Sequence, residues 1–282
     1  MVTILALGSA MLYGSADFMG GAAARRAHPL AVLAITAPAG AFVMLVAALL
    51  TGGWSAMTAA GTGWAIAGGA AGSFGLMAFY AGFAAAPMSV VAPVTALIAT
   101  VLPVGVAIAQ GERPSATVAI GAVVCVAAVI LVSTERGGAT KLSARLKALG
   151  YAVPAGAAFG MFFLFLRDAG TDGVVWPVAI ARVTGTLVAL ACCVAIGVRP
   201  LGWRPDRAAF GVAVTSGVFD AAANVAYVMA TRAGMFGLAV VVTSLYPGVT
   251  VLLARCVFGE RMRWVQQAGL VLAGIGVALV TV

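Results

Sequence analysis

The sequence predicts an all-α integral membrane protein with ten transmembrane helices, arranged as two inverted five-helix repeats. Three observations lead to this prediction. Of the 282 residues, 63% are hydrophobic and only 9% are charged, whereas about 25% of the residues are charged in a typical soluble domain. Ten apolar stretches of the sequence each approach the ~20 residues that a helix needs to cross a bilayer. The second half of the chain also repeats the first at a nearly constant offset.

The ten predicted spans follow one another with mostly short connections. The first repeat, 1–140, contains spans at 2–22, 29–51, 63–85, 87–109 and 115–133. The second repeat, 141–282, contains spans at 148–166, 174–197, 208–231, 236–258 and 265–282. All five tryptophans lie in connections or at helix ends, where amphipathic rings favour the membrane interface, and this supports the boundaries. The fifth and tenth spans are almost purely aliphatic.

The clearest mark of the duplication is a short polar turn. The run Gly111-Glu112-Arg113 recurs 148 residues later as Gly259-Glu260-Arg261. Because each copy has an odd number of spans, the second copy enters the membrane in the opposite orientation. Two halves related in this way can exchange conformations and open a central site to either side, as secondary transporters do. The alternative is a duplicated scaffold with no path through it.

These turns resemble those of the EamA type of the drug/metabolite transporter superfamily, in which the fourth helix of each repeat ends with Gly-Glu-Arg. The resemblance covers the whole chain. It implies a basket of ten helices around a central cavity and, in many members, export of amino acids, other metabolites, drugs or lipid-linked sugars. Members are commonly drawn with both termini in the cytoplasm, which differs from the orientation that the charges of this sequence favour.

Basic residues divide unequally between the two sides of the predicted bundle. Eleven lie in the connections after spans one, five, seven and nine: Arg25, Arg26, Arg136, Lys141, Arg145, Lys147, Arg199, Arg204, Arg207, Arg261 and Arg263. The opposite side holds only Arg113, Arg167 and Arg232. Since cationic connections stay in the cytoplasm, both termini are predicted to lie outside the cell (inner) membrane. The net charge of +8 therefore reflects topology, and no nucleic-acid partner is predicted.

Four ionisable residues lie well inside predicted spans, namely Asp17, Arg182, Asp220 and Arg255. Each costs roughly 2.5–3.5 kcal/mol on insertion scales, so pairing or water must offset them. None has a charged counterpart in the other repeat. The fold evidently forms without them, which favours a role in a central cavity. For Arg255 the alternative is that its side chain extends to the interface.

Polar residues also follow single faces of three helices. In the eighth span, Ser216, Asp220, Asn224, Tyr227 and Thr231 are three or four residues apart and share one stripe. We expect substrate-binding or coupling residues among Asp17, Arg182, Asp220, Asn224, Tyr13, Tyr227, Tyr246 and Thr243. The alternative for such stripes is hydrogen bonding between helices.

The residue types suggest a mechanism. An arginine holds an anionic group such as a carboxylate, and an aspartate in a dry site can bind a proton. If Arg182 pairs with Asp17 or with Asp220, the other acid becomes the proton carrier; the sequence leaves the pairing open. Small multidrug resistance proteins, a related family, carry an essential acid that aligns with Gly14, one turn before Asp17.

Other functions find less support in the sequence. There is no HExxH or GxSxG motif, and the four cysteines lack metal-ligand spacing, so neither an enzyme nor a cofactor is expected. Asp17 and Asp220 could formally supply an aspartyl dyad, but they occupy unmatched positions of the repeat. The alternative within transport is a flippase for a lipid-linked headgroup. An excess of arginine over lysine, with abundant alanine and glycine, suggests a GC-rich bacterial genome.

Glycine and proline are expected to shape the helices. Gly68-x-x-x-Gly72 and Gly156-x-x-x-Gly160 favour close helix packing. Pro93, Pro103 and Pro247 should interrupt the fourth and ninth spans and free backbone carbonyl groups. Such interruptions serve either as pivots for alternating access or as static kinks.

Overall fold

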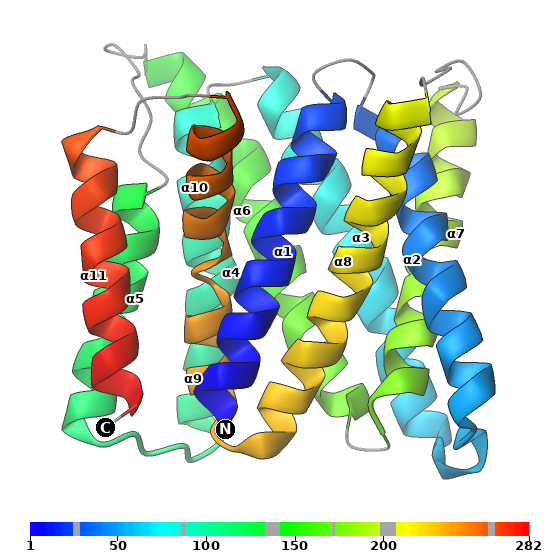
Figure 1. Ribbon diagram of the computed structural model, residues 1–282, viewed down its shortest axis with the longest axis horizontal. Coiled ribbons are helices and arrows are strands. Elements are labelled where there is room, and N and C mark those ends of the chain that lie inside the picture. The colour runs from blue at the N-terminus through cyan, green and yellow to red at the C-terminus, as the bar shows by residue number, and fades with distance from the viewer. Residues whose placement is uncertain are drawn as a thin grey trace.

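The computed structural model describes residues 1–24, 29–85, 88–132, 142–170, 173–197, 207–258 and 263–281, and these form a bundle of helices with no strand among them (Figure 1). The first repeat contains α1 (Val2–Ala24), α2 (Pro29–Thr51), the short 3-10 helix η1 (Trp54–Ala56), α3 (Ala59–Ala85), α4 (Met88–Ala109) and α5 (Ala116–Val132). The second contains α6 (Leu142–Ala169), α7 (Val175–Ile196), α8 (Arg207–Ala233), α9 (Phe236–Thr243), α10 (Tyr246–Phe258) and α11 (Trp264–Thr281).

The ninth predicted span is divided into two helices. α9 ends at Thr243, and α10 begins at Tyr246 after a two-residue turn. Pro247 explains the division, because a proline has no N–H to donate to the carbonyl group of Thr243 four residues earlier. The expected interruption of the ninth span is therefore confirmed. The fourth span differs, since α4 runs without a break through Pro93 and Pro103.

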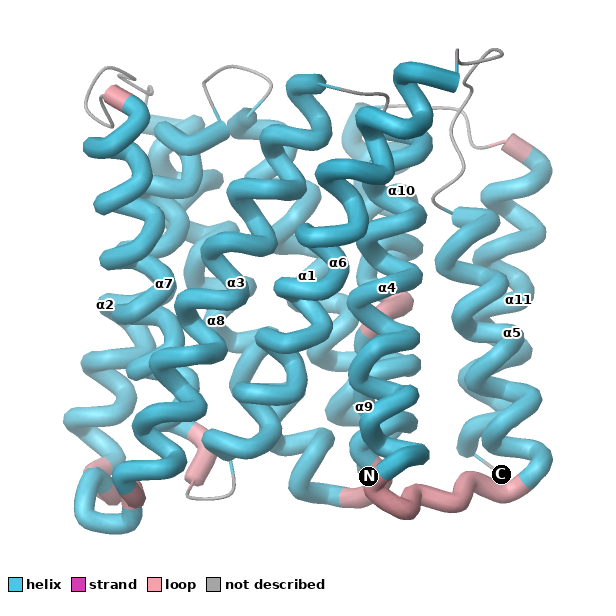
Figure 2. Tube along the Cα trace, turned by 180° about the vertical axis from the view of Figure 1, so that it is seen from behind, coloured by secondary structure: helices cyan, strands magenta, loops and turns pink. Residues whose placement is uncertain are grey.

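The helices of one repeat pack mainly against helices of the other repeat. α1 packs along α8, and its counterpart α6 packs along α3. α2 packs along α7 and α5 along α11, so each of these pairs joins a helix to its own counterpart. The two aliphatic helices α5 and α11 lie together at one edge of the bundle in both views (Figure 1, Figure 2). This arrangement is that of two inverted five-helix repeats, as the sequence predicted.

Both chain termini lie at the same end of the bundle, which we call the termini end (Figure 1). The helix ends that flank the four cationic connections lie at the opposite end, which we call the basic end (Figure 1). The connections themselves, with Arg25, Arg26 and His28 in the first, fall largely outside the described residues. The same holds for the repeat boundary at residue 140, for Gly259-Glu260-Arg261 and for the side chain of Arg255.

The outer surface suits a bilayer. Large apolar side chains such as Phe42, Leu50 and Val194 are 69%, 83% and 78% exposed. Among the described residues, five helices are long and apolar enough to cross a membrane, and four further apolar segments are shorter. An all-helical surface of this kind satisfies its own backbone hydrogen bonds in lipid.

The two glycine motifs allow close helix contacts, as predicted. A Cβ atom at Gly68 would lie 3.4 Å from the Cβ of Phe165 in α6. A Cβ atom at Gly156 would lie only 2.7 Å from both the Cβ of Ile98 and the carbonyl oxygen of Thr95 in α4. α6 is therefore held tightly between α3 and α4, which fixes its aromatic residues in the centre of the bundle.

Candidate functional site

An arginine and an aspartate meet between α7 and α8. Nη1 of Arg182 bonds Oδ2 of Asp220, and Nη2 donates to the Asp220 carbonyl oxygen at 3.2 Å. Asp220 is the central residue of α8, so the pair lies at mid-depth in the bundle. The two side chains are 16% and 33% exposed. The structure thus assigns the pairing that the sequence left open, since Arg182 binds Asp220.

Two further predicted residues extend this pair into a network. Nδ2 of Asn224 donates to the Asp220 carbonyl oxygen at 2.6 Å, and the Tyr13 hydroxyl donates to Oδ1 of Asn224 at 2.9 Å. Tyr13 is on α1, so the network connects α1, α8 and α7. Asn224 and Tyr13 are buried, and each polar group satisfies another, as buried polar groups must.

The second intramembrane acid, Asp17, lies beside this network without joining it. Asp17 is one helical turn after Tyr13 and shares its face of α1. On either side of that face, Ala16 accepts a hydrogen bond from Ser216 of α8, while Gly14 packs on Tyr246 of α10. The Asp17 side chain therefore points into the bundle.

The surroundings of Asp17 leave its carboxylate accessible. The side chain is exposed, although it faces the interior and lies within electrostatic range of Asp220 and Tyr246. Among the described residues it makes no hydrogen bond and no ion pair. An accessible carboxylate inside the bundle requires water beside it.

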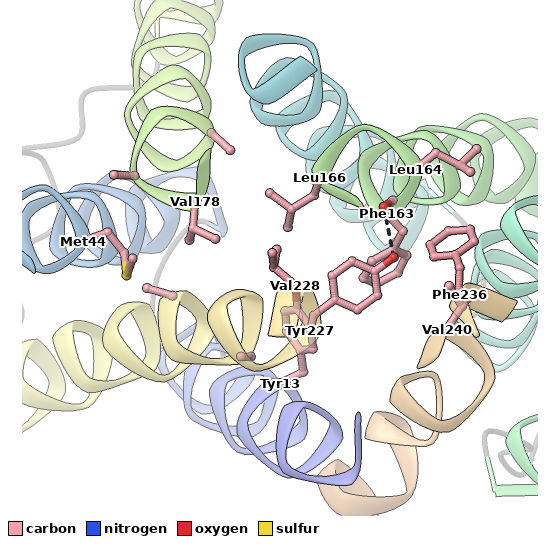
Figure 3. Close-up of a cluster of buried hydrophobic side chains, with 14 of the residues drawn as sticks. Tyr13, Met44, Phe163, Leu164, Leu166, Val178, Tyr227, Val228, Phe236 and Val240 are labelled. Atoms are coloured by element: carbon pink, nitrogen blue, oxygen red, sulfur yellow. Dashed lines mark hydrogen bonds between the residues drawn. The ribbon is translucent and has the colours of Figure 1, made fainter. Parts of the chain in front are cut away.

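An aromatic cluster fills the bundle between this network and the termini end. The hydroxyl of Tyr227 donates to the carbonyl oxygen of Phe163 at 2.9 Å, which joins α8 to α6 (Figure 3). The ring centroids of these two residues are 4.8 Å apart, and Tyr13 contacts Phe163 edge-on at 6.3 Å. Phe236 and Val240 of α9 complete the same cluster. Its residues are buried, so it closes the interior at this level.

The remaining predicted residues lie around the helix break. Tyr246 is partly buried, and its ring centroid is 6.2 Å from that of Tyr13. Thr243 is 1% exposed, and its hydroxyl has no hydrogen-bond partner among the described residues. Thr231, at the end of the α8 stripe, donates to the carbonyl oxygen of Val228 in its own helix. The network thus gathers Arg182, Asp220, Asn224 and Tyr13, which leaves Tyr227 and Thr243 in packed surroundings.

The aromatic residues that α6 and α9 contribute to the site could not be recognised from the sequence. Phe163 and Phe236 look like ordinary apolar residues of a membrane span, and no periodic pattern separates them from the lipid-facing ones. Ser9 lies at a spacing of four residues from Tyr13 and so shares the polar stripe of the first span. Its hydroxyl donates to the carbonyl oxygen of Ala223 at 2.9 Å, which is the hydrogen bonding between helices given as the alternative for such stripes.

Among the described residues, no group of three or more His, Cys, Asp or Glu side chains could hold a metal ion. The polar groups that the structure describes in the interior are one paired arginine, two carboxylates and several hydroxyl and amide groups.

Comparison with known proteins agrees with this geometry. Residues 146–282 match the EamA-like transporter family. The second repeat is an EamA-like transporter domain. The resemblance seen in the Gly-Glu-Arg turns is confirmed over these residues, and the match indicates a multi-pass membrane transporter.

The fold of the whole chain is also found in solved structures. A crystal structure of another protein superposes with a TM-score of 0.82 at 16% sequence identity, covering 99% of this chain and 96% of that chain. At this identity the similarity concerns the fold, and it extends over both repeats. No protein of curated function matches the sequence.

Proposed function

We propose that the protein is a secondary transporter that exports a small organic solute carrying a carboxylate, such as an amino acid, by alternating access. The observation that carries the proposal is the Arg182–Asp220 pair at mid-depth, next to the accessible carboxylate of Asp17. The planar guanidinium group of Arg182 matches a carboxylate, which it can bind with two parallel hydrogen bonds.

In the absence of substrate, the carboxylate of Asp220 binds the guanidinium group of Arg182. A substrate carboxylate would replace Asp220 on the guanidinium group, so that one arginine alternates between two anions. This exchange avoids leaving Arg182 unpaired inside the membrane, where an isolated charge is costly. The Asn224 amide and the Tyr13 hydroxyl, which already bond the Asp220 peptide and each other, are placed to bind the polar groups of the same solute.

Asp17 is the proposed proton carrier. Asp220 is paired with Arg182, whereas Asp17 has no cationic partner among the described residues. Because a nearby cation favours the charged form of a carboxyl group, the acid without such a partner is the one proposed to bind a proton. Proton entry through Asp17 would drive solute export in the opposite direction.

The charge distribution gives the proposed orientation. With the basic end in the cytoplasm and both termini outside, the aromatic cluster closes the outer side of the interior. Asp17 lies 15 residues after Val2, about 22 Å along α1 from the termini end at 1.5 Å per residue. Asp17 is therefore on the cytoplasmic side of the cluster, where an exporter loads its substrate. The proposed location is the inner membrane of a bacterium.

The test compares solutes inside and outside cells that express the wild-type chain, Asp220→Asn or Thr215→Val at equal membrane abundance, by untargeted mass spectrometry. Thr215 is a matched control on the same helix, because it is exposed and its hydroxyl donates to the carbonyl oxygen of Gly211, within its own helix. We expect one class of carboxylate-bearing solutes to move outward with the wild type and Thr215→Val, but not with Asp220→Asn. If the three strains share one solute profile, the proposal is wrong, and lipid flipping is the activity to assay next.

A further inference from the structure

The Gly-Glu-Arg turn after α4 has a defined geometry. Gly111 has a φ of +99° and follows the last turn of the helix. The N–H of Gly111 donates to the carbonyl oxygen of Ile108 at 3.0 Å, and the N–H of Glu112 donates to that of Ala107 at 3.0 Å. These two bonds form a Schellman motif, which needs a glycine because its φ is positive. The motif turns the chain so that the side chain of Glu112 leaves the helix sideways.

The Glu112 carboxylate binds the start of α9. Oε1 accepts a hydrogen bond from the N–H of Phe236 at 2.7 Å, and Oε2 accepts one from the N–H of Gly237 at 2.9 Å. The residue before α9, Met235, provides no side-chain cap of its own. Without Glu112 these N–H groups would lack a partner, and a carboxylate also interacts favourably with the positive end of a helix dipole.

The sequence of α9 suits this contact. A Cβ atom at Gly237 would lie 3.0 Å from Oε2 of Glu112 and 3.5 Å from the Cβ of Ala107. Any side chain at position 237 would therefore push the carboxylate away from the helix. The glycine permits both oxygens to reach the backbone.

This contact joins the two repeats at the termini end of the bundle. Glu112 belongs to the α4–α5 connection of the first repeat, and α9 belongs to the second (Figure 1). A second bridge lies beside it: Nη1 of Arg167 in α6 donates to Oε1 of Gln110 at 2.8 Å, and its guanidinium carbon is 4.4 Å from the ring centroid of Phe236. Phe236 is both the first residue of α9 and a member of the aromatic cluster, so the contact holds the cluster in place.

We propose that the Glu112 carboxylate, together with the N–H groups of Phe236 and Gly237, forms a latch that keeps the termini end closed and releases α9 when the interior opens to that side. Alternating access requires that contacts between the repeats at the closed end break reversibly. The latch meets this requirement. Once the groups separate, water can form hydrogen bonds with the carboxylate and with both N–H groups, which keeps the free-energy cost of opening small. It is independent of the identity of the solute and of Asp17.

The test measures accessibility and needs no substrate. In a chain whose four native cysteines are replaced, Val240→Cys places a thiol in the aromatic cluster, where Val240 is 1% exposed and lies next to Phe236 (Figure 3). A membrane-impermeant maleimide is added to sealed vesicles of each orientation, and the labelling rate from the termini side is recorded. Glu112→Gln keeps the side-chain length but removes the charge and one acceptor. We expect it to raise this rate about fivefold, the factor typical of losing a helix cap.

Two further variants distinguish a latch from a helix cap that only stabilises the fold. Ser115→Ala is the matched control, because Oγ of Ser115 in the same connection accepts a hydrogen bond from the N–H of Val118 and caps α5 within its own repeat. It should leave the labelling rate unchanged. Gly237→Ala should raise the rate as Glu112→Gln does, without altering Glu112 itself. The latch is disproved if well-expressed Glu112→Gln and Gly237→Ala proteins label at the wild-type rate, or if Ser115→Ala accelerates labelling equally.

Discussion

Breaking the Arg182–Asp220 pair from one side should cost more than removing both charges together. Asp220→Asn leaves a guanidinium group without its anion, and Arg182→Gln leaves a carboxylate without its cation. A hydrogen bond to a charged group contributes about 1.5–3 kcal/mol. Because the two side chains are 16% and 33% exposed, water screens part of this interaction, and we expect about 1–2 kcal/mol for each single variant.

The assay is a double-mutant cycle on detergent-solubilised protein. Apparent melting temperatures of the wild type, both single variants and Arg182→Gln/Asp220→Asn are read from the folded fraction that survives heating. A change of about 1–2 kcal/mol corresponds to roughly 2–8 °C for a chain of this size. The double variant should melt above both single variants, since the second substitution removes the charge that the first left unpaired.

A second cycle that combines Arg182→Gln with Thr215→Val serves as the control and should be additive. Distant, independent sites add within about 0.5 kcal/mol. If the Arg182–Asp220 cycle is also additive within that limit, the two charges do not stabilise one another, and the exchange of anions on Arg182 loses its basis.

Three further predictions concern coupling, the helix break and packing. Asp17→Asn should still bind solute but should export it at a rate that no longer responds to an inward proton gradient; an unchanged response in vesicles would remove Asp17 from the coupling role. Pro247→Ala supplies an N–H that can donate to the carbonyl group of Thr243, so it should raise the apparent melting temperature while slowing transport. A faster transporter would show that the break is not a pivot. Gly156→Ala places a Cβ atom 2.7 Å from Ile98 and should lower the melting temperature by several degrees, whereas Gly8→Ala, which meets nothing within 4 Å, should not.

Hydropathy and helical periodicity predict the parts of this molecule that depend on local sequence. The ten spans, the inverted duplication and the aliphatic pair α5 and α11 all follow from runs of apolar residues and their repetition. The stripe on α8 was also informative, since Ser216, Asp220, Asn224 and Tyr227 each contact another helix.

The parts that depend on how helices meet could not be predicted. Spacing along α8 gives the direction of Asp220 but not the helix that faces it, so Asp17 and Asp220 are equivalent candidates to pair with Arg182 when only the sequence is known. Thr243 shows another limit of spacing. Its position on a polar stripe suggests that it lines a water-filled cavity, whereas the structure buries it at the helix break. Glu112 was recognised as part of a repeated motif, but its partner lies 124 residues away.

The packing of each helix on its counterpart has a consequence for how such a protein can evolve. The pairs α2–α7 and α5–α11 are contacts that two identical half-length chains could make with each other, since each joins matching surfaces. A homodimer of that kind would carry every charge twice. In the fused chain, Arg182 is matched by Ala34 and Asp220 by Gly72, so a single ion pair stands where a dimer would be forced to carry two. Joining the halves in one gene is what allows the interior to hold this guanidinium group and its carboxylate without a symmetry-related copy of either.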